Sequence, residues 1–278
     1  GANKPGDIAE LCNIADPTHG IITNIGKAHL EGFINFEGVL KTKTELYASV
    51  QQKGGVLFAC MDDSILMNAC QNYPLPLITF GSHPDALIVG ELAYLDPFVH
   101  FSWYNHDYHS PTLHTHLVGK YNFNNFLAAI TFGNIFQVNP TDINAAIEGY
   151  IPQNNRSQVT KTDKNTVIVD CYNANPSSMK SALESFVDIE EGTKTVILGD
   201  MLELGSDGLS EHEAILNYCR EHELHFITVG PIFKGLNDKG YTTTQDLIEQ
   251  WPTIALQNQL ILLKGSRGIA LEKILPLL

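Results

Sequence analysis

The chain has 278 residues, of which 44% are hydrophobic and 17% charged, a composition typical of a globular protein long enough for two domains. Its 17 basic and 31 acidic side chains give a formal net charge of −14, which argues against nonspecific nucleic-acid binding because that requires a basic surface. No run of about 18 or more apolar residues predicts a membrane span, and the N-terminus lacks the basic head and apolar core of a secretory signal. The five cysteines form no CxxC pair, so we expect reduced thiols and a cytoplasmic location.

The first half of the chain begins as helices and strands and then changes pattern. Residues 86–118 hold short alternating segments rich in Tyr, Phe and His, which indicate an antiparallel meander. In chain order we predict a helix over 6–16, a strand over 20–26, a long helix over 37–50, buried strands over 54–60 and 77–81, the meander, and helices over 122–137 and 141–149.

The second half alternates short apolar strands with helices. We predict strands over 166–170, 195–199, 225–230 and 260–265, and helices over 177–189 (with serine at its N-cap), 210–222, 244–250 and 267–276. This alternation indicates βαβ units, so the fold class is α/β and the C-terminal domain should hold a Rossmann-like parallel sheet. The polar, proline-containing stretch 151–158 predicts a linker, and we place the domains at 1–155 and 156–278.

Polar residues follow three strands of this predicted sheet. Asp170, Asn173 and Asn175 come after the first strand, GDMLELG after the second and KGSRG after the last. Ligands bind beyond the carboxyl ends of the strands in an open parallel sheet, so together these segments predict a cleft. Turn formation and helix capping are the alternative explanation.

The segment KGSRG places Lys264 and Arg267 around a tight turn at a predicted helix start. Backbone N–H groups and two cations suit a phosphate or a carboxylate.

Lys43 falls in the middle of the apolar stripe of the predicted helix 37–50. Lys41, two residues earlier, points about 200° away around the axis. A lysine on a buried face must be paired, neutral or chemically changed, or else it extends its ammonium group to water. The pattern alone leaves these alternatives open.

Two other positions have a structural and a functional interpretation. His29 lies just after a strand, where a histidine is usually structural although it is also a common metal ligand. Asn122 and Asn125 share one face at a helix start, where paired amides can read an adenine edge but usually cap the helix.

Six segments occur in an order that resembles the Mur ligase family over essentially the whole chain: GANKPGDIAEL, TNIGKAHLEGF, GKYNFNN, VDCYNANPSSM, LGDMLELG and KGSRG. The resemblance implies an ATP-dependent amide ligase that works through an acyl phosphate, with Mg²⁺ neutralising the phosphates. The motifs YNANPSSM, GDMLELG and KGSR are most similar to the branch that joins D-alanyl-D-alanine to UDP-N-acetylmuramoyl-tripeptide in peptidoglycan synthesis.

The resemblance also implies roles in the first domain, which it identifies as the remainder of a central ATPase domain with a mixed sheet. His29 corresponds to a magnesium ligand, and Lys43 to a carbamylated lysine that helps hold a second magnesium. Carbamylation would turn a costly buried cation into an oxygen ligand. Asn122 and Asn125 correspond to asparagines beside the adenine.

In the second domain, Arg156 corresponds to a linker arginine near the nucleotide phosphates, and Asp170 to a ribose-binding acid. Four further residues are expected to lie toward the incoming dipeptide: Asn173, Asn175, Lys264 and Arg267.

The sequence departs from the family pattern in two ways. Tyr121 stands where many relatives have histidine, which affects the expected nucleotide contact there. The phosphate loop G-x₄-G-K-[ST] and a UDP-binding domain are absent from these 278 residues. We therefore expect the C-terminal part of a longer ligase, inactive by itself.

Two other functions remain as alternatives. One is another amide ligase of the same superfamily, of the folylpolyglutamate or cyanophycin type, against which YNANPSSM and GDMLELG argue. The other is a non-catalytic module that binds a small anion in the C-terminal cleft.

Overall fold

The structure is a computed structural model that describes residues 2–26, 33, 35–153, 155–190, 192–254 and 256–278. The chain forms two compact units. The first comprises Gly1–Tyr94, Val99–Thr115 and Lys120–Tyr150, and the second comprises Leu95–Phe98, His116–Gly119 and Ile151–Leu278. Within the described ranges, no helix combines the length and the apolar character that a membrane crossing requires.

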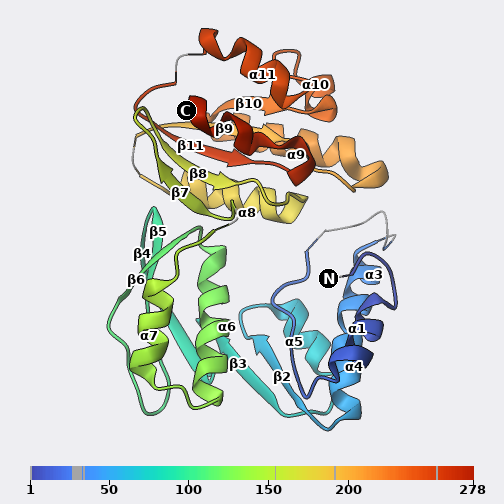
Figure 1. Ribbon diagram of the computed structural model, residues 1–278. Helices are drawn as coiled ribbons and strands as arrows, with labels where there is room; N and C mark the ends of the chain where they lie inside the picture. The colour runs from blue at the N-terminus through green and yellow to red at the C-terminus, as the bar shows by residue number, and fades with distance from the viewer. Residues whose placement is uncertain (1, 27–32, 34, 154, 191, 255) are drawn as a thin grey trace. The chain divides into compact units, whose positions relative to one another are not determined.

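The first unit is built on a six-stranded sheet with the order β1-β2-β3-β4-β5-β6 (Figure 1). Its strands are β1 His19–Ile21, β2 Val56–Cys60, β3 Leu77–Gly81, β4 Ile88–Asp96, β5 Phe98–Tyr104 and β6 Leu113–Val118. Strands β1 to β4 pair in parallel. A single residue, Pro97, separates β4 from its sheet neighbour β5, and so short a connection permits only an antiparallel pair. The mixed sheet confirms the predicted change of pattern.

Helices cover both faces of this sheet because consecutive strand residues, which point to opposite faces, are both apolar, as in VLFAC of β2. The helices are α1 Asp7–Ala15, α3 Phe36–Lys43, α4 Glu45–Gln52, α5 Ser64–Cys70, α6 Tyr121–Ile135 and α7 Pro140–Gly149. Leu57 and Ala59 of β2 pack in one core with Tyr47 of α4. Phe58, between them, stacks on Phe132 of α6, with ring centroids 4.3 Å apart. Both faces of β2 are therefore buried.

The predicted long helix over 37–50 is two helices, α3 and α4, that meet at Thr44. The Thr44 hydroxyl donates to the carbonyl oxygens of Leu40 and Lys41, each at 3.0 Å. A hydroxyl bonded to the preceding turn competes with the regular ladder and bends a helix. The apolar stripe still lies on one side, with Val39 and Tyr47 buried.

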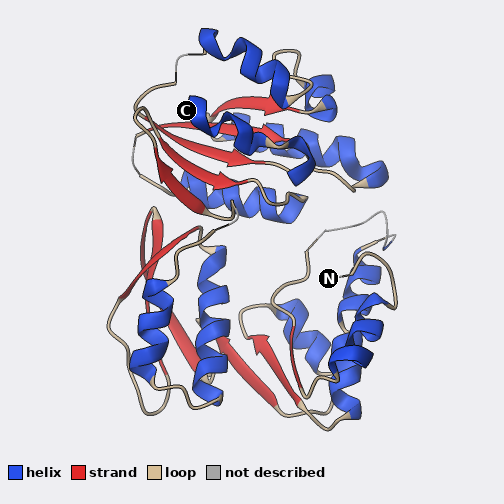
Figure 2. Ribbon diagram, in the orientation of Figure 1, coloured by secondary structure: helices blue, strands red, loops and turns tan. Residues whose placement is uncertain are grey.

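The second unit holds a five-stranded sheet with the order β10-β9-β11-β8-β7 (Figures 1 and 2). Its strands are β7 Gln158–Lys161, β8 Thr166–Asp170, β9 Thr193–Gly199, β10 His225–Val229 and β11 Gln259–Lys264. The last four form parallel pairs, as the sequence predicts. The edge strand β7 is antiparallel to β8 and was not predicted, because its polar residues do not show the apolar run of a buried strand.

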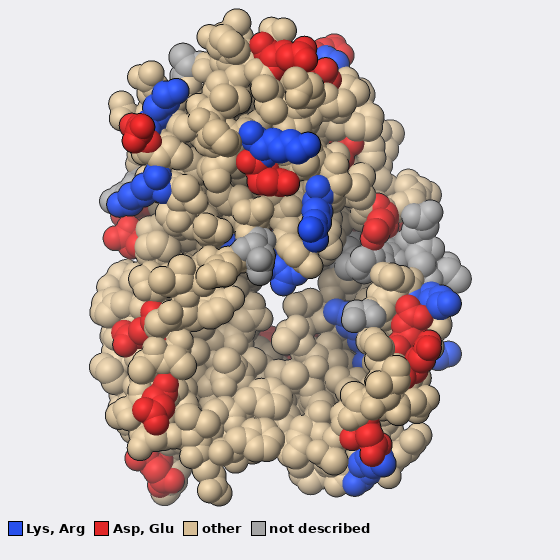
Figure 3. All heavy atoms as spheres, in the orientation of Figure 1, with Lys and Arg blue, Asp and Glu red and all other residues tan. Residues whose placement is uncertain are grey.

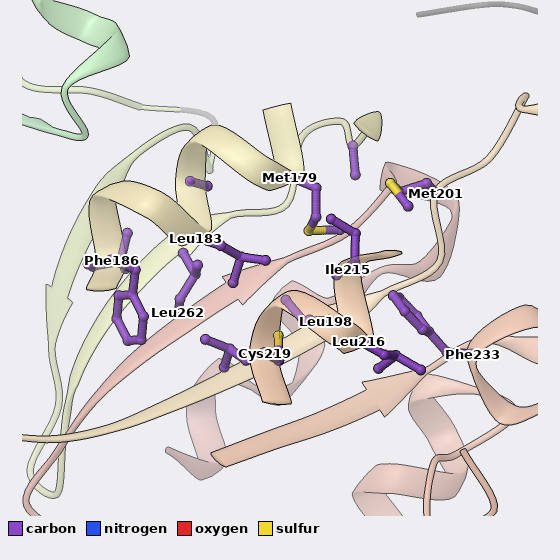
Figure 4. Close-up of a cluster of buried hydrophobic side chains, with 14 of the residues drawn as sticks. Met179, Leu183, Phe186, Leu198, Met201, Ile215, Leu216, Cys219, Phe233 and Leu262 are labelled. Atoms are coloured by element: carbon purple, nitrogen blue, oxygen red, sulfur yellow. The ribbon is translucent and has the colours of Figure 1, made fainter. Parts of the chain in front are cut away.

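Two hydrophobic clusters lie on the two faces of this sheet and make it the middle of three layers. The helices are α8 Pro176–Val187, α9 Gly208–Glu221, α10 Pro231–Leu236 and α11 Thr244–Gln250. One cluster, drawn in Figure 4, joins strand residues such as Leu198 and Leu262 to Phe186 of α8. The other joins strand residues such as Ile261 to Leu247 of α11. This three-layer arrangement confirms the α/β prediction.

Two local predictions in this unit are wrong. The last helix is a pair of 3₁₀ segments, η3 Arg267–Ile269 and η4 Leu271–Leu277, separated by Ala270 at a φ of 57°. The N-cap of α8 is Asn175 rather than a serine, because its side chain accepts the Ser178 N–H at 2.9 Å while Pro176 occupies the first turn.

Charged side chains of both signs are interspersed on the molecular face drawn in Figure 3. One exposed pair of opposite charges is formed by Lys180 of α8, whose ammonium nitrogen lies 3.8 Å from a carboxylate oxygen of Glu184, one helical turn later. Such mixed surfaces keep a protein solvated, and exposed pairs of this kind contribute little to stability.

Phe186→Ala should lower the free energy of unfolding by about 3–5 kcal/mol, because it removes a ring that is 1% exposed from the cluster in Figure 4. Urea denaturation followed by circular dichroism measures the change. Leu209→Ala, at a side chain on α9 that is 60% exposed, is the control and should stay within about 0.5 kcal/mol. Equal losses in the two variants would contradict the assignment of this cluster as core.

Candidate functional site

The carboxyl ends of three neighbouring strands lie level in the second unit. Lys264 at the end of β11 is paired in register with Asp170 of β8 and with Leu198 of β9. The three polar segments that follow these strands therefore start from the same edge of the sheet, as the sequence predicts. This is the edge at which parallel α/β sheets bind ligands.

Asp170 and Lys264 form an ion pair at this edge. The Lys264 ammonium nitrogen lies 2.5 Å from Oδ2 of Asp170, and the two side chains are 2% and 13% exposed, lysine first. The backbone N–H of Ser157 donates to the other carboxylate oxygen at 3.3 Å. The Asp170 carboxylate thus holds the Lys264 ammonium group inside the edge of the sheet. Lys264 is therefore not exposed on the turn that follows β11.

Two arginines flank one tyrosine ring in the same unit. The guanidinium carbon of Arg156 lies 3.8 Å from the ring centroid of Tyr172, and that of Arg267 lies 5.7 Å from it. Both arginines are exposed. Stacking fixes the guanidinium planes while their N–H groups remain able to donate, and such groups bind phosphates and carboxylates through paired hydrogen bonds. Tyr172 was not singled out from the sequence.

Asn173 and Asn175 take part in local backbone structure. The Asn173 side-chain oxygen accepts the N–H of Ala174 at 2.8 Å. Asn175 forms a capping box with Ser178, whose hydroxyl accepts the Asn175 N–H at 3.1 Å. The turn-and-cap explanation therefore accounts for part of this motif, and the role of both asparagines toward a substrate stays a prediction.

Asp200, the acid of GDMLELG, is fully buried and caps α10. Its carboxylate accepts the backbone N–H groups of Ile232 and Phe233 at 2.8 and 2.9 Å. Gly230 has a φ of 128°, and a Cβ there would lie 2.2 Å from the Asp200 carboxyl carbon. The sequence analysis singled out this motif as polar. It did not predict α10, whose first-turn N–H groups are the hydrogen-bond partners of Asp200.

His212 is a second buried group that the sequence analysis missed. Its Nε2 accepts the N–H of Met201 at 2.9 Å, and its Nδ1 donates to the carbonyl oxygen of Gly208 at 2.6 Å. This pattern requires a neutral ring. Burial lowers the pKa of His212 below its ordinary value, although the Gly208 carbonyl and the carboxylates of Asp200 and Glu211 oppose the shift.

Among the first unit's candidates, Lys43 ends α3 and is half-buried. Its ammonium group donates to the carbonyl oxygen of Asn24 at 2.7 Å, whereas Lys41 is exposed. Burial lowers the pKa of Lys43 from its ordinary value. His29, the predicted metal ligand, lies outside the described residues.

Asn122 and Asn125, in the first turns of α6, form a hydrogen bond with each other. The Asn125 amide donates to the Asn122 side-chain oxygen at 3.1 Å, and Lys120 at the N-cap makes no side-chain capping bond. The role of these two amides toward an adenine stays a prediction. The neighbouring Asn124 has a buried side-chain oxygen to which no described residue donates a hydrogen bond.

Among the described residues there is no group of three or more His, Cys, Asp or Glu side chains placed to hold a metal. The Lys43 ammonium group cannot ligate a cation, because it has no lone pair while protonated.

Asp170→Ala should lower the free energy of unfolding by about 3–5 kcal/mol, because it leaves the Lys264 ammonium buried without its counter-charge. Chemical denaturation of the protein measures the change. Glu184→Ala, in the exposed pair with Lys180, is the matched control and should cost no more than about 0.5 kcal/mol. Adding Lys264→Met to Asp170→Ala should restore part of the loss, and no recovery would show that the ion pair is not its cause.

Stability should fall as the pH drops from about 7 to about 5, by up to about 1.4 kcal/mol per pH unit for His212. Because the folded-state pKa of His212 lies below its unfolded value, the unfolded chain binds the proton first. The contribution of neutral His212 to stability is complete above the unfolded-state pKa. It is lost as the pH falls from that value through the lower folded-state pKa. Denaturation at several pH values measures the slope, which His212→Gln should reduce. His222→Gln, at an exposed histidine, is the control; an unchanged slope in His212→Gln would contradict this origin.

Comparison with known proteins relates both halves of the chain to one family of enzymes. Residues 1–133 match the Mur ligase middle domain, and residues 155–267 match the Mur ligase, glutamate ligase domain. The UDP-N-acetylmuramoyl-tripeptide–D-alanyl-D-alanine ligases of Bacillus subtilis and Rickettsia prowazekii are 31% and 27% identical over 99% of this chain. A crystal structure of MurF from Acinetobacter baumannii superposes with a TM-score of 0.87 at 26% identity, over 99% of this chain and 62% of that one.

The chain spans 62% and 64% of the length of the two curated relatives. The two domain matches follow one another along the sequence and together leave out only 134–154 and 268–278. The chain belongs to the Mur ligase family.

Proposed function

We propose that the gene product containing these 278 residues is an ATP-dependent amide ligase that adds D-alanyl-D-alanine to UDP-N-acetylmuramoyl-tripeptide in the cytoplasm. The observation that carries the proposal is the 31% identity to the Bacillus subtilis ligase of that name over 99% of this chain. The five cysteines, all free and buried, are consistent with a reducing compartment. We assign residues 1–155 to the ATPase domain and 156–278 to the C-terminal ligase domain.

The geometry of the second unit supports binding of anionic and hydroxyl groups. ATP would supply the phosphoryl group that converts the peptide carboxylate into an acyl phosphate, which the dipeptide amine attacks. Arg156 and Arg267 present exposed guanidinium groups for phosphate or carboxylate oxygens. Asp170 retains carboxylate lone pairs that can accept from a ribose hydroxyl, beyond its bonds to Lys264 and Ser157.

Asn122 and Asn125 support the proposed adenine contact. Their mutual hydrogen bond uses one amide donor and one carbonyl acceptor, so the Asn125 carbonyl oxygen remains able to accept from an exocyclic amine. We propose that Asn173, Asn175, Lys264 and Arg267 lie toward the dipeptide. Lys264 would act there through the position of the Asp170 carboxylate rather than by direct contact, because it is almost fully buried.

Lys43 is proposed as a carbamylated ligand for Mg²⁺, together with His29. The neutral amine is the form that reacts with CO₂, and burial, by lowering the pKa of Lys43, increases the neutral fraction. The carbamate would provide the oxygen donors that the unmodified side chain lacks. Magnesium bound there would neutralise phosphate charge.

The folylpolyglutamate-type alternative is less well supported. Both curated relatives described above are UDP-N-acetylmuramoyl-tripeptide–D-alanyl-D-alanine ligases, and each matches 99% of this chain. The non-catalytic alternative predicts that Lys43 has no effect on a reaction. Both alternatives are separated from the proposal by the same assay.

Lys43→Ala in the full gene product should lower ATP-dependent ligation by about 100-fold or more, since loss of even an outer-shell partner of a metal typically costs 10–100-fold. Release of inorganic phosphate and formation of the UDP-linked pentapeptide are measured with both peptide substrates. Lys41→Ala, at the exposed lysine two residues away, is the matched control and should be unaffected.

Full activity in Lys43→Ala would contradict the proposed role of this lysine, and ligation of glutamate to a folate would support the other ligase type. NMR with isotope-labelled bicarbonate tests the modification directly, because a carbamate carbon should be present in the unsubstituted protein and absent from Lys43→Ala.

A further inference from the structure

Ser266 lies where the three segments that follow β8, β9 and β11 meet. Its hydroxyl oxygen accepts the backbone N–H of Leu202 at 3.0 Å and donates to the carbonyl oxygen of Ala174 at 3.4 Å. Its own N–H donates to the carbonyl oxygen of Asp200 at 3.2 Å. The side chain is 3% exposed, so these bonds are shielded from water. One small residue thus links all three strand-end segments.

The segments that follow β9 and β11 approach each other closely next to Ser266. A Cβ on Gly265 would lie 2.8 Å from the Cα of Gly199, closer than real Cβ contacts. The ends of β9 and β11 therefore approach each other through two glycines. The Ser266 hydroxyl connects this point to Leu202, in the segment after β9, and to Ala174, in the segment after β8.

The segment that Leu202 belongs to is fixed independently on its other side. His212 accepts the N–H of Met201, and the Asp200 carboxylate is bound to the first turn of α10. Both groups are fully buried. The Leu202–Ser266 bond therefore joins this anchored segment to the segment that follows β11.

The residues linked by Ser266 stand next to exposed groups at the sheet edge. Ala174 lies between Asn173 and Asn175, and Ser266 directly precedes Arg267. The side chains of Asn173 and Arg267 are exposed. Any change in the Ser266 bonds would move these groups relative to one another.

We propose that Ser266 is a positioning residue that sets the spacing of the three strand-end segments and thereby the binding of the amino dipeptide. The proposal rests on the proposed function, because the dipeptide is the substrate assigned to these segments. The Asp170–Lys264 pair is held by the register of β8 and β11 themselves, so the nucleotide side should be affected much less. A small displacement of binding groups raises KM or lowers the rate steeply, because productive geometry is narrow.

The test compares Ser266→Ala with Ser185→Ala in the full gene product. Ser185 is also a buried serine of this unit, but its hydroxyl donates within α8 to the carbonyl oxygen of Ser181 at 2.9 Å. Ser266→Ala should raise KM for D-alanyl-D-alanine about 10-fold or more, while KM for ATP changes less than about twofold. Ser266→Thr, which keeps the hydroxyl, should recover most of the dipeptide affinity. Ser185→Ala should change neither constant.

Amide hydrogen exchange gives a readout that does not depend on activity. Exchange at Leu202 should become faster in Ser266→Ala, which lacks the acceptor, and stay unchanged in Ser185→Ala. Unchanged exchange at Leu202, or equal increases of KM for ATP and dipeptide, would overturn the positioning role. Absence of any D-alanyl-D-alanine ligation by the unsubstituted protein would instead overturn the proposed function, and the exchange result would still decide whether Ser266 holds this segment.

Discussion

The ion pair between Asp170 and Lys264 is the interaction on which the candidate site depends. Removing two opposite charges from water is costly, and only close contact with further hydrogen bonds offsets that cost. Here the parallel register places the two residues opposite each other at the ends of β8 and β11, and the Ser157 N–H adds a bond to the carboxylate. The pair therefore holds the carboxyl ends of β8 and β11 level with each other. It also keeps the Lys264 ammonium group inside the edge of the sheet.

This arrangement leaves the arginines as the exposed cations of the strand edge. Arg156 and Arg267 both lie within cation–π distance of the Tyr172 ring. An aromatic ring orients a guanidinium without consuming its hydrogen-bond donors. Burial of one cation against a carboxylate and stacking of two others on a ring leave two exposed guanidinium groups at the same edge.

The sequence predicted the parallel strands well because buried β-branched runs are a local signal, as in TVIVD, which ends at Asp170. It also predicted that polar segments collect at one edge, since parallel strands end on the same side. It did not predict which groups pair: Asp170 and Lys264 are 94 positions apart, and only the strand order brings them together. The break at Thr44 was missed because it depends on a side-chain hydroxyl bond that propensity does not encode.

Lys264, which is buried, and Lys43, which is half-buried, show two ways in which a protein accommodates a lysine away from water. Lys264 has a full carboxylate charge against its ammonium group, which compensates for the lost hydration. The described hydrogen-bond partner of Lys43 is a carbonyl oxygen, whose dipole stabilises a cation less than a full negative charge does. Burial therefore lowers the pKa of Lys43 and increases the fraction of its neutral amine. The neutral amine is the nucleophilic form, and it is the form that the proposed carbamylation of Lys43 requires.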